Sequence, residues 1–113
     1  MAGCIFCRIA GGEIPAKIEF QDDRAVAFQD TAPKSPVHVL VIPRRHIESL
    51  NDPVDDEGLL GYLLAVAARI AREKGIDGKG YRTVINTGAE AGQSVFHLHV
   101  HVMGGRTMHW PPG

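Results

Sequence analysis

The sequence lacks the features that direct a chain into or across a membrane. Apolar stretches such as residues 39–42 are short, whereas a membrane-spanning helix needs roughly 18 or more consecutive apolar residues. The first residues also lack the charged-then-apolar layout of a secretion signal. We therefore expect a cytoplasmic protein without a membrane partner.

The sequence also has no excess of positive charge. Twelve Lys and Arg residues are balanced by thirteen Asp and Glu residues, so the formal net charge is -1 at pH 7. Proteins that bind DNA or RNA usually gather positive charge to neutralise phosphates. The charge balance therefore argues against a nucleic-acid polymer as partner.

Cysteine is scarce as well. Only Cys4 and Cys7 are present, three positions apart. Two cysteines at this spacing, together with the absence of an export signal, suggest a reduced compartment, where metal binding is favoured over a disulfide, although one pair alone does not prove a metal. The alternative is that both are small apolar side chains packed at the edge of a core.

The sequence does contain enough apolar material for one domain over residues 1–113, since 44% of its residues are hydrophobic. Apolar stretches bounded by Pro, Gly or Asp predict five strands. They fall at residues 18–20, 25–28, 37–42, 81–86 and 96–103, with a loop of small residues at 89–93 before the last strand. The first three are expected to form a meander.

One long helix is predicted between the third and fourth strands. Pro53 suits the first helical position, and Gly75 suits the position after the end. The acidic residues Asp55, Asp56 and Glu57 would then lie in the first turn. Four apolar residues fall on one face, which should pack on the sheet: Leu59, Leu63, Val66 and Ile70. Strands, one helix, then strands indicate an α+β fold.

Three histidines alternate along the last predicted strand. His97, His99 and His101 would share one face, because successive side chains of a strand point to opposite faces. The intervening apolar residues, at 98, 100 and 102, would be buried on the other face. A neutral imidazole offers a lone pair that can attack phosphorus, provided that its tautomer is fixed by a hydrogen bond to the other ring nitrogen.

Other interpretations of these histidines stay open. A single histidine is most often a hydrogen-bonded core residue, and alternating histidines also bind zinc or iron. A catalytic metal site usually adds a carboxylate, and no Asp or Glu follows His101 in the sequence. Ser94 precedes the row in a glycine-containing loop; it could meet an anion, or it could be an ordinary polar residue of a loop.

Several motifs, taken in order, resemble the Hint branch of the histidine-triad superfamily. The most informative is GQSVFHLHVHV at residues 92–102, followed by GGR at 104–106 and HWPPG at 109–113. Further matching segments are residues 13–18, 22–24, 37–43 and 81–82. The resemblance therefore covers nearly the whole chain.

The resemblance implies both a fold and an activity. The fold would be an antiparallel five-stranded sheet with one long helix and a short N-terminal helix, and the sheet would continue across a homodimer. The activity would be hydrolysis of purine nucleoside phosphoramidates or aminoacyl-adenylates to the nucleoside monophosphate, of the AMP or GMP type. It would proceed through a covalent nucleotidyl-histidine, with no cofactor required for catalysis.

Positions that match the family's motif are expected to take its roles. His99 would be the nucleophile, and His101, His38 and His97 would support it. Ser94 would help to protonate the leaving amine. Together these five residues form the implied catalytic group.

The resemblance also implies contacts to the substrate. Asp30 would bind the ribose hydroxyls, and Asn86 would lie beside the phosphate and the nucleophile. An apolar slot for the base and further contacts are implied for Ile5, Phe6, Ile9 and Phe28, and for Gly92 and Gln93. Gln29 and Thr31 depart from the family's usual residues around the acidic position, which leaves the base preference open.

A structural zinc site and an ordered tail follow from the same resemblance. Cys4, Cys7, His46 and His97 match the zinc ligands of related branches, and a zinc there would tie the N-terminal segment to the sheet. Residues 109–113 would form a loose tail on sequence chemistry alone. The resemblance implies instead an ordered strap, which in a two-fold dimer would reach the partner's cleft.

Two other functions remain as alternatives to the covalent hydrolase. One is a metal-dependent enzyme that uses the histidine row as ligands. The other is a non-catalytic module that binds purine nucleotides or a protein partner.

Overall fold

The computed structural model describes residues 3–52 and 56–113. Its first three strands form the predicted meander. Strands β1 (Ile18–Gln21), β2 (Ala25–Gln29) and β3 (Val37–Pro43) pair in antiparallel succession. Asp22 makes the first turn tight, because its Oδ1 accepts the backbone N–H groups of Arg24 and Ala25, both at 2.8 Å.

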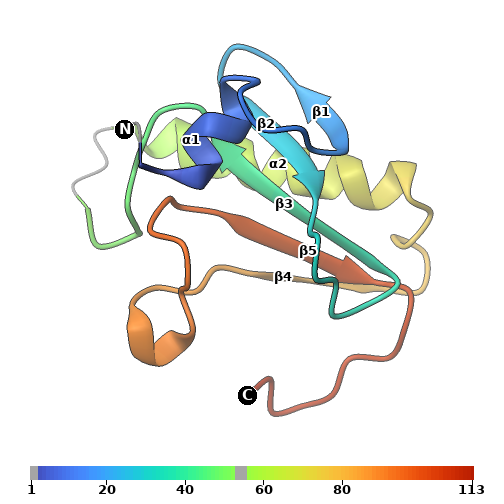
Figure 1. Cartoon of the computed structure of the whole chain (residues 1–113). Helices are drawn as coiled ribbons and strands as arrows, with labels where there is room; N and C mark the ends of the chain where they lie inside the picture. The colour runs from blue at the N-terminus through green and yellow to red at the C-terminus, as the bar shows by residue number, and fades with distance from the viewer. Residues whose placement is uncertain (1–2, 53–55) are drawn as a thin grey trace.

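The other two strands complete a five-stranded antiparallel sheet. Its strand order is β1-β2-β3-β5-β4, so β5 (Val100–Gly104) is inserted between β3 and β4 (Tyr81–Val84). The sheet therefore confirms the predicted antiparallel α+β fold (Figure 1). A short 3-10 helix, Ala89–Ala91, lies in the segment predicted as a loop between these strands.

Two strand boundaries were wrong. The predicted strand at 81–86 ends at Val84, and the predicted strand at 96–103 begins only at Val100. The Pro43 carbonyl at the end of β3 accepts a hydrogen bond from the His97 ring, Nε2 to O 2.8 Å, and the Leu98 amide donates to the Ile47 carbonyl. The backbone at 96–99 therefore follows a loop and not the edge of β3.

The long helix α2 (Glu57–Glu73) covers one face of the sheet (Figure 1). Asp56 is its N-cap, since Oδ1 accepts the Leu59 amide at 3.1 Å, and is therefore not a first-turn residue. The predicted start at Pro53, and Asp55 with it, lie outside the described residues. At the other end Gly75 has φ +73°, a conformation that glycine adopts readily.

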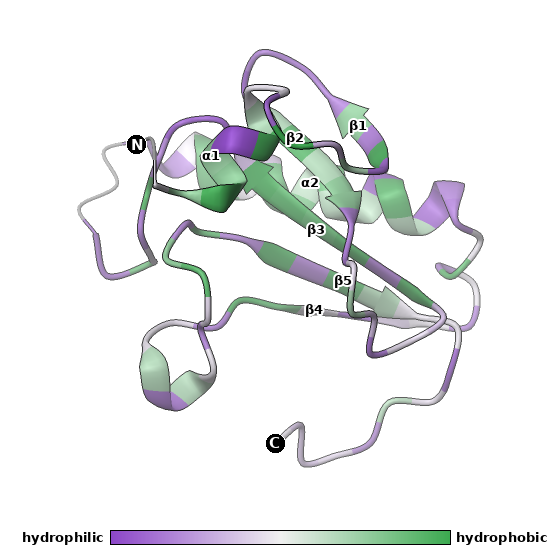
Figure 2. Cartoon of the chain, in the orientation of Figure 1, coloured by the Kyte–Doolittle hydropathy of each residue, from purple (hydrophilic) through white to green (hydrophobic). Residues whose placement is uncertain are grey.

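The two faces of the sheet bury different clusters. The predicted face of α2, with Leu59, Leu63, Val66 and Ile70, is buried as expected against side chains that include Val39, Val41, Val100 and Val102. The opposite face packs against the short helix α1 (Ile5–Ala10) through Phe6, and holds Val26, Phe28, Leu40 and Ile42. Figure 2 shows the resulting alternation along β5, where hydrophobic and hydrophilic residues follow one another.

The C-terminal residues lie on the surface of this chain. Trp110 is 82% exposed, with the Arg82 guanidinium 5.9 Å from its ring centroid. Among the described helices, none combines the length and the apolar character that crossing a membrane requires.

Candidate functional site

A cavity of about 910 Å³ opens on the face of the sheet that carries α1. Its volume is within the range of small-molecule sites. Apolar side chains, among them some from α1, β2 and β3, form much of its wall, and polar or ionisable side chains form the rest. The lining residues are Ile5, Phe6, Ile9, Ile14, Pro15, Ala16, Lys17, Phe28, Gln29, Asp30, Thr31, Pro33, Leu40, Ser94, Val95, His99 and His101.

The cavity brings together eight of the residues expected to act on a substrate. They are Ile5, Phe6, Ile9, Phe28, Asp30, Ser94, His99 and His101. Three others, Asn86, Gly92 and Gln93, are not among its lining residues. The Gln93 side chain is buried and bonded within the loops, where it donates to the Glu48 carbonyl at 2.7 Å and accepts the Gly88 amide at 2.9 Å.

The wall also contains residues that the sequence analysis did not single out, mainly Ile14, Pro15, Ala16 and Lys17. They precede β1 and carry no chemistry that marks them as a site. Leu40 was detectable in principle, because β3 pairs it with His101 and therefore places both side chains on one face.

One hydrogen bond fixes the tautomer of His99. Its Nδ1 lies 2.7 Å from the His97 carbonyl oxygen, and a carbonyl only accepts, so Nδ1 carries the proton. The lone pair is therefore on Nε2. The ring is buried, 6% exposed, and lines the cavity. In its neutral form, His99 thus has a free lone pair on Nε2 beside the cavity.

A second chain of hydrogen bonds fixes His101 with the opposite polarity. The Lys34 amide donates to His38 Nδ1 at 3.0 Å, so His38 carries its proton on Nε2, which lies 2.9 Å from His101 Nδ1. His101 Nδ1 accepts, and its proton is therefore on Nε2. That Nε2 is buried and has no partner among the described residues. A buried donor without a partner is costly, and a ligand oxygen would satisfy it.

Burial favours the neutral forms of His101 and His38. It lowers the pKa of His101 to about 4, with further lowering by His99 and His38. The pKa of His38 is also lowered, chiefly by burial, although the Asp30 carboxylate opposes the shift. Asp30 Oδ2 lies 3.4 Å from His38 Nε2, and its Oδ1 accepts the Ala32 amide at 2.8 Å. At neutral pH the chain of hydrogen bonds from Lys34 through His38 to His101 therefore keeps the polarity described above.

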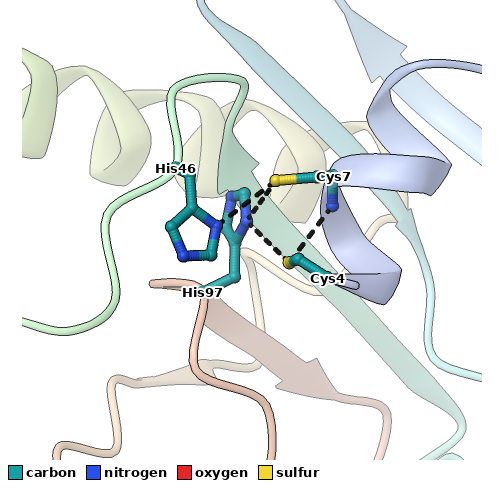
Figure 3. A group of neighbouring side chains, drawn as sticks. All are labelled: Cys4, Cys7, His46 and His97. Atoms are coloured by element: carbon teal, nitrogen blue, oxygen red, sulfur yellow. Dashed lines mark hydrogen bonds between the residues drawn. The ribbon is translucent and has the colours of Figure 1, made fainter. Parts of the chain in front are cut away.

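His97, the first histidine of the row, faces a different group of side chains. Figure 3 shows Cys4 and Cys7, from the start of α1, directed at His97 and at His46 of the loop after β3. His97 Nδ1 lies 3.3 Å from Cys4 Sγ and 3.5 Å from Cys7 Sγ, and His46 Nδ1 lies 3.3 Å from Cys7 Sγ. We call these four residues the Cys–His cluster.

The Cys–His cluster has the donors and the spacing of a tetrahedral zinc site. With Zn–S of about 2.3 Å and Zn–N of about 2.0–2.1 Å, a sulfur and a nitrogen ligand lie about 3.5 Å apart. His97 Nε2 donates to the Pro43 carbonyl, so Nδ1 presents a lone pair to the cysteines. Burial raises the pKa of the Cys7 thiol, and the neighbouring Cys4 raises it further. A bound cation would favour the thiolate.

A second group of close donors fits a metal less well. Asp30, His38 and His101 have ligand atoms near one another. However, the Lys34 amide takes the lone pair of His38 Nδ1, and His38 Nε2 carries a proton. A neutral His38 therefore has no lone pair for an ion at this position.

Comparison with known proteins places these features in a family. The model of the HIT domain matches residues 11–108. A HIT family hydrolase from Legionella pneumophila Philadelphia 1 is 46% identical, with a TM-score of 0.95 over 98% of this chain and 100% of that one. This similarity accounts for both the sheet order and the arrangement of the two helices.

Two further solved structures carry a ligand in their names. A histidine triad nucleotide-binding protein from Candida albicans is 31% identical, with a TM-score of 0.83 over 96% of this chain and 83% of that one. A Zn-bound histidine triad family protein from Mycobacterium smegmatis is 35% identical, with a TM-score of 0.82 over 94% of this chain and 77% of that one.

Proposed function

Because the chain belongs to the HIT domain family, we propose that it is a hydrolase that releases a purine nucleoside monophosphate from phosphoramidates or aminoacyl-adenylates, with His99 as the covalent nucleophile. One observation carries the proposal. Two imidazoles line the same cavity with opposite polarity: the neutral form of His99 has its lone pair on Nε2, and His101 has an Nε2–H without a partner among the described residues. A nucleophile and a donor for a phosphoryl oxygen are thus paired.

The reaction follows from these two groups. The His99 Nε2 lone pair attacks the α-phosphorus, the bond to the leaving amine or carboxylate breaks, and a nucleotidyl-histidine forms. A leaving amine takes up a proton through the Ser94 hydroxyl on the cavity wall, and the water of the next step returns a proton to Ser94. Water then attacks the phosphorus, breaks the P–N bond to His99 and releases the monophosphate. His101 Nε2–H stabilises the charge on the phosphoryl oxygens in both steps.

The rest of the cavity fits a nucleoside. The purine would lie among Ile5, Phe6, Ile9 and Phe28, which offer apolar and aromatic surface. Asp30 would accept the ribose hydroxyls, and this favours ribonucleotides over deoxyribonucleotides. Gln29 and Thr31 flank that carboxylate on the cavity wall and are the polar residues that would tune the base preference.

Incubation with adenosine 5′-phosphoramidate tests the proposal directly. We expect release of AMP that persists in the presence of a chelator, because no step of the reaction passes through a metal. AMP binding without any release would favour the non-catalytic nucleotide-binding module. Release abolished by the chelator and restored by a divalent ion that does not occupy the Cys–His cluster would favour the metal-dependent enzyme.

We further propose that the Cys–His cluster holds one zinc ion through Cys4, Cys7, His46 and His97. Such an ion would be structural, because four protein ligands leave no open position for a substrate. It would tie α1 to the sheet and to the loop after β3. Two cysteines that form no disulfide and can bind a metal fit a reducing compartment such as the cytoplasm.

The active unit is proposed to be a homodimer with a continuous sheet. Strand β4 is at the end of the strand order, so one of its edges has no partner strand among the described residues. None of the residues that line the cavity comes from the described tail, residues 107–113. Trp110 is exposed and available to cover the cavity of a partner in a two-fold dimer.

Deleting residues 107–113 tests the role of the tail. We expect kcat/KM for at least one of several phosphoramidates to change by about tenfold or more, because the tail would shape the space for the leaving group. The Tm should change little, since these residues are largely exposed. A truncated protein with every kcat/KM within about twofold of the full chain would make the tail a passive end.

A further inference from the structure

Helix α1 is too short to be stable by itself. It has six residues, and isolated helices shorter than about 12–15 residues are marginal in water. Its position therefore depends on contacts with the rest of the protein. The C-terminal end is held by Arg44, whose Nη1 donates to the Ala10 carbonyl at 2.7 Å. The N-terminal end is held by Cys4 and Cys7, the two sulfur members of the Cys–His cluster (Figure 3).

The same end of α1 forms part of the substrate cavity. Phe6 lies between the two cysteines in the sequence and is buried, while Ile5 and Phe6 both line the cavity. The Phe6 ring packs edge-on against Phe28, with 5.4 Å between centroids, and against His99, with 5.2 Å. A shift of the N-terminal end of α1 would therefore move the wall proposed for the base and a side chain in contact with the proposed nucleophile.

A second connection runs through His97. Its ring belongs to the Cys–His cluster, with Nδ1 at 3.3 Å from Cys4 Sγ, while its backbone carbonyl accepts the His99 Nδ1–H at 2.7 Å. That carbonyl fixes the tautomer and the direction of the His99 lone pair. The cluster therefore contacts the cavity at two places: the apolar wall through α1, and the nucleophile through one peptide unit.

We propose that the Cys–His cluster is a positioning device for the nucleotide site, so that binding of a zinc ion and binding of the nucleotide strengthen one another. The proposal rests on the proposed function and adds to it a coupling between two sites that share no ligand atom. Cys4, Cys7 and His46 are positioning residues in this scheme. By thermodynamic linkage, the factor by which zinc improves nucleotide affinity must equal the factor by which the nucleotide improves zinc affinity.

The test measures that factor from both sides, with AMP as the nucleotide and a reductant present. AMP affinity is measured by calorimetry for the zinc-loaded protein and for the protein after chelation. We expect about a tenfold weaker Kd without zinc, a typical size for coupling between sites. In the zinc-loaded protein, saturating AMP should slow the transfer of zinc to a colorimetric chelator by up to a similar factor. This second measurement needs no metal-free protein and stands even if chelation unfolds the chain.

Two variants separate the cluster from general effects on its loop. His46→Gln removes one ligand that lies outside the cavity, and it should weaken both zinc and AMP binding. Glu48→Gln is the matched control, because this exposed side chain lies two positions further along the same loop and outside the cluster. It should leave both affinities unchanged. Hydrogen exchange in α1 should be slowed by zinc in the wild type and not in His46→Gln.

The possible failures are distinguishable. If AMP binds with the same affinity, within about twofold, with and without zinc, and zinc leaves at the same rate with and without AMP, the coupling is overturned and the proposed function survives. A protein that takes up no zinc but binds AMP overturns it in the same way. A zinc-loaded protein that does not bind AMP overturns both.

Discussion

Replacing His99 with Asn is expected to lower turnover of adenosine 5′-phosphoramidate by at least about 10⁴-fold, the scale of losing a covalent nucleophile. Asn cannot attack phosphorus, but its amide N–H can still donate to the His97 carbonyl that now accepts from His99 Nδ1. The cavity should therefore keep its shape. We expect the AMP Kd to change by less than about threefold.

His101→Asn provides the matched comparison for that result. It removes the unpartnered Nε2–H donor but leaves the nucleophile in place, so we expect a smaller loss, of about 10²- to 10³-fold. Mass spectrometry of the wild type, quenched during turnover, should find a protein heavier by one nucleotidyl group, and His99→Asn should show none. Near-normal turnover by His99→Asn would remove this residue from the nucleophile's role.

The double variant Cys4→Ser, Cys7→Ser is expected to bind no zinc and to melt about 16 °C below the zinc-loaded wild type. At a free zinc concentration about 1,000 times Kd, a bound ion stabilises the folded state by about 4 kcal/mol. For a domain of this size 1 kcal/mol shifts Tm by about 4 °C. Serine preserves the size of the side chains, so the loss reports on the ion more than on packing.

Chelated wild type is the control for this variant. Its Tm should coincide with that of the double variant, and added zinc should raise only the wild type. Metal analysis of the purified wild type should find about one zinc per chain, and His99→Asn should keep it. A wild type that takes up no zinc, or one whose Tm does not respond to the ion, would show that the cysteines are ordinary packing residues.

The periodicity of the sequence was enough to predict the sheet and the helix. Val100 and Val102 are buried under α2 while His101 is on the other face, as strict alternation requires. The apolar face of α2 follows in the same way from its spacing. These features could be predicted because they depend on the spacing of apolar and polar residues along the chain.

The division of labour among the histidines could not be predicted from spacing. The sequence suggests one row of three on a strand, but β5 begins at Val100, so that His97 and His99 both precede it and only His101 lies in it. The His97 ring joins Cys4 and Cys7, more than 85 positions earlier, because Pro43 and the loop after β3 hold it there. The tautomers likewise depend on contacts that form in the folded structure. The His97 carbonyl fixes that of His99, and the Lys34 amide, through His38, fixes that of His101.

The direction of the hydrogen bonds that run from the Lys34 amide through His38 to His101 limits what His101 can do with its proton. A peptide N–H only donates, so His38 Nδ1 stays an acceptor and His38 Nε2–H stays directed at His101 Nδ1. If neutral His101 released the proton on Nε2, His38 could pass its Nε2 proton to His101 Nδ1, but the Lys34 amide could not replace the proton that His38 lost. The pair is thus suited to donating a hydrogen bond to the phosphoryl group, with the proton staying on His101, and not to acting as a general acid.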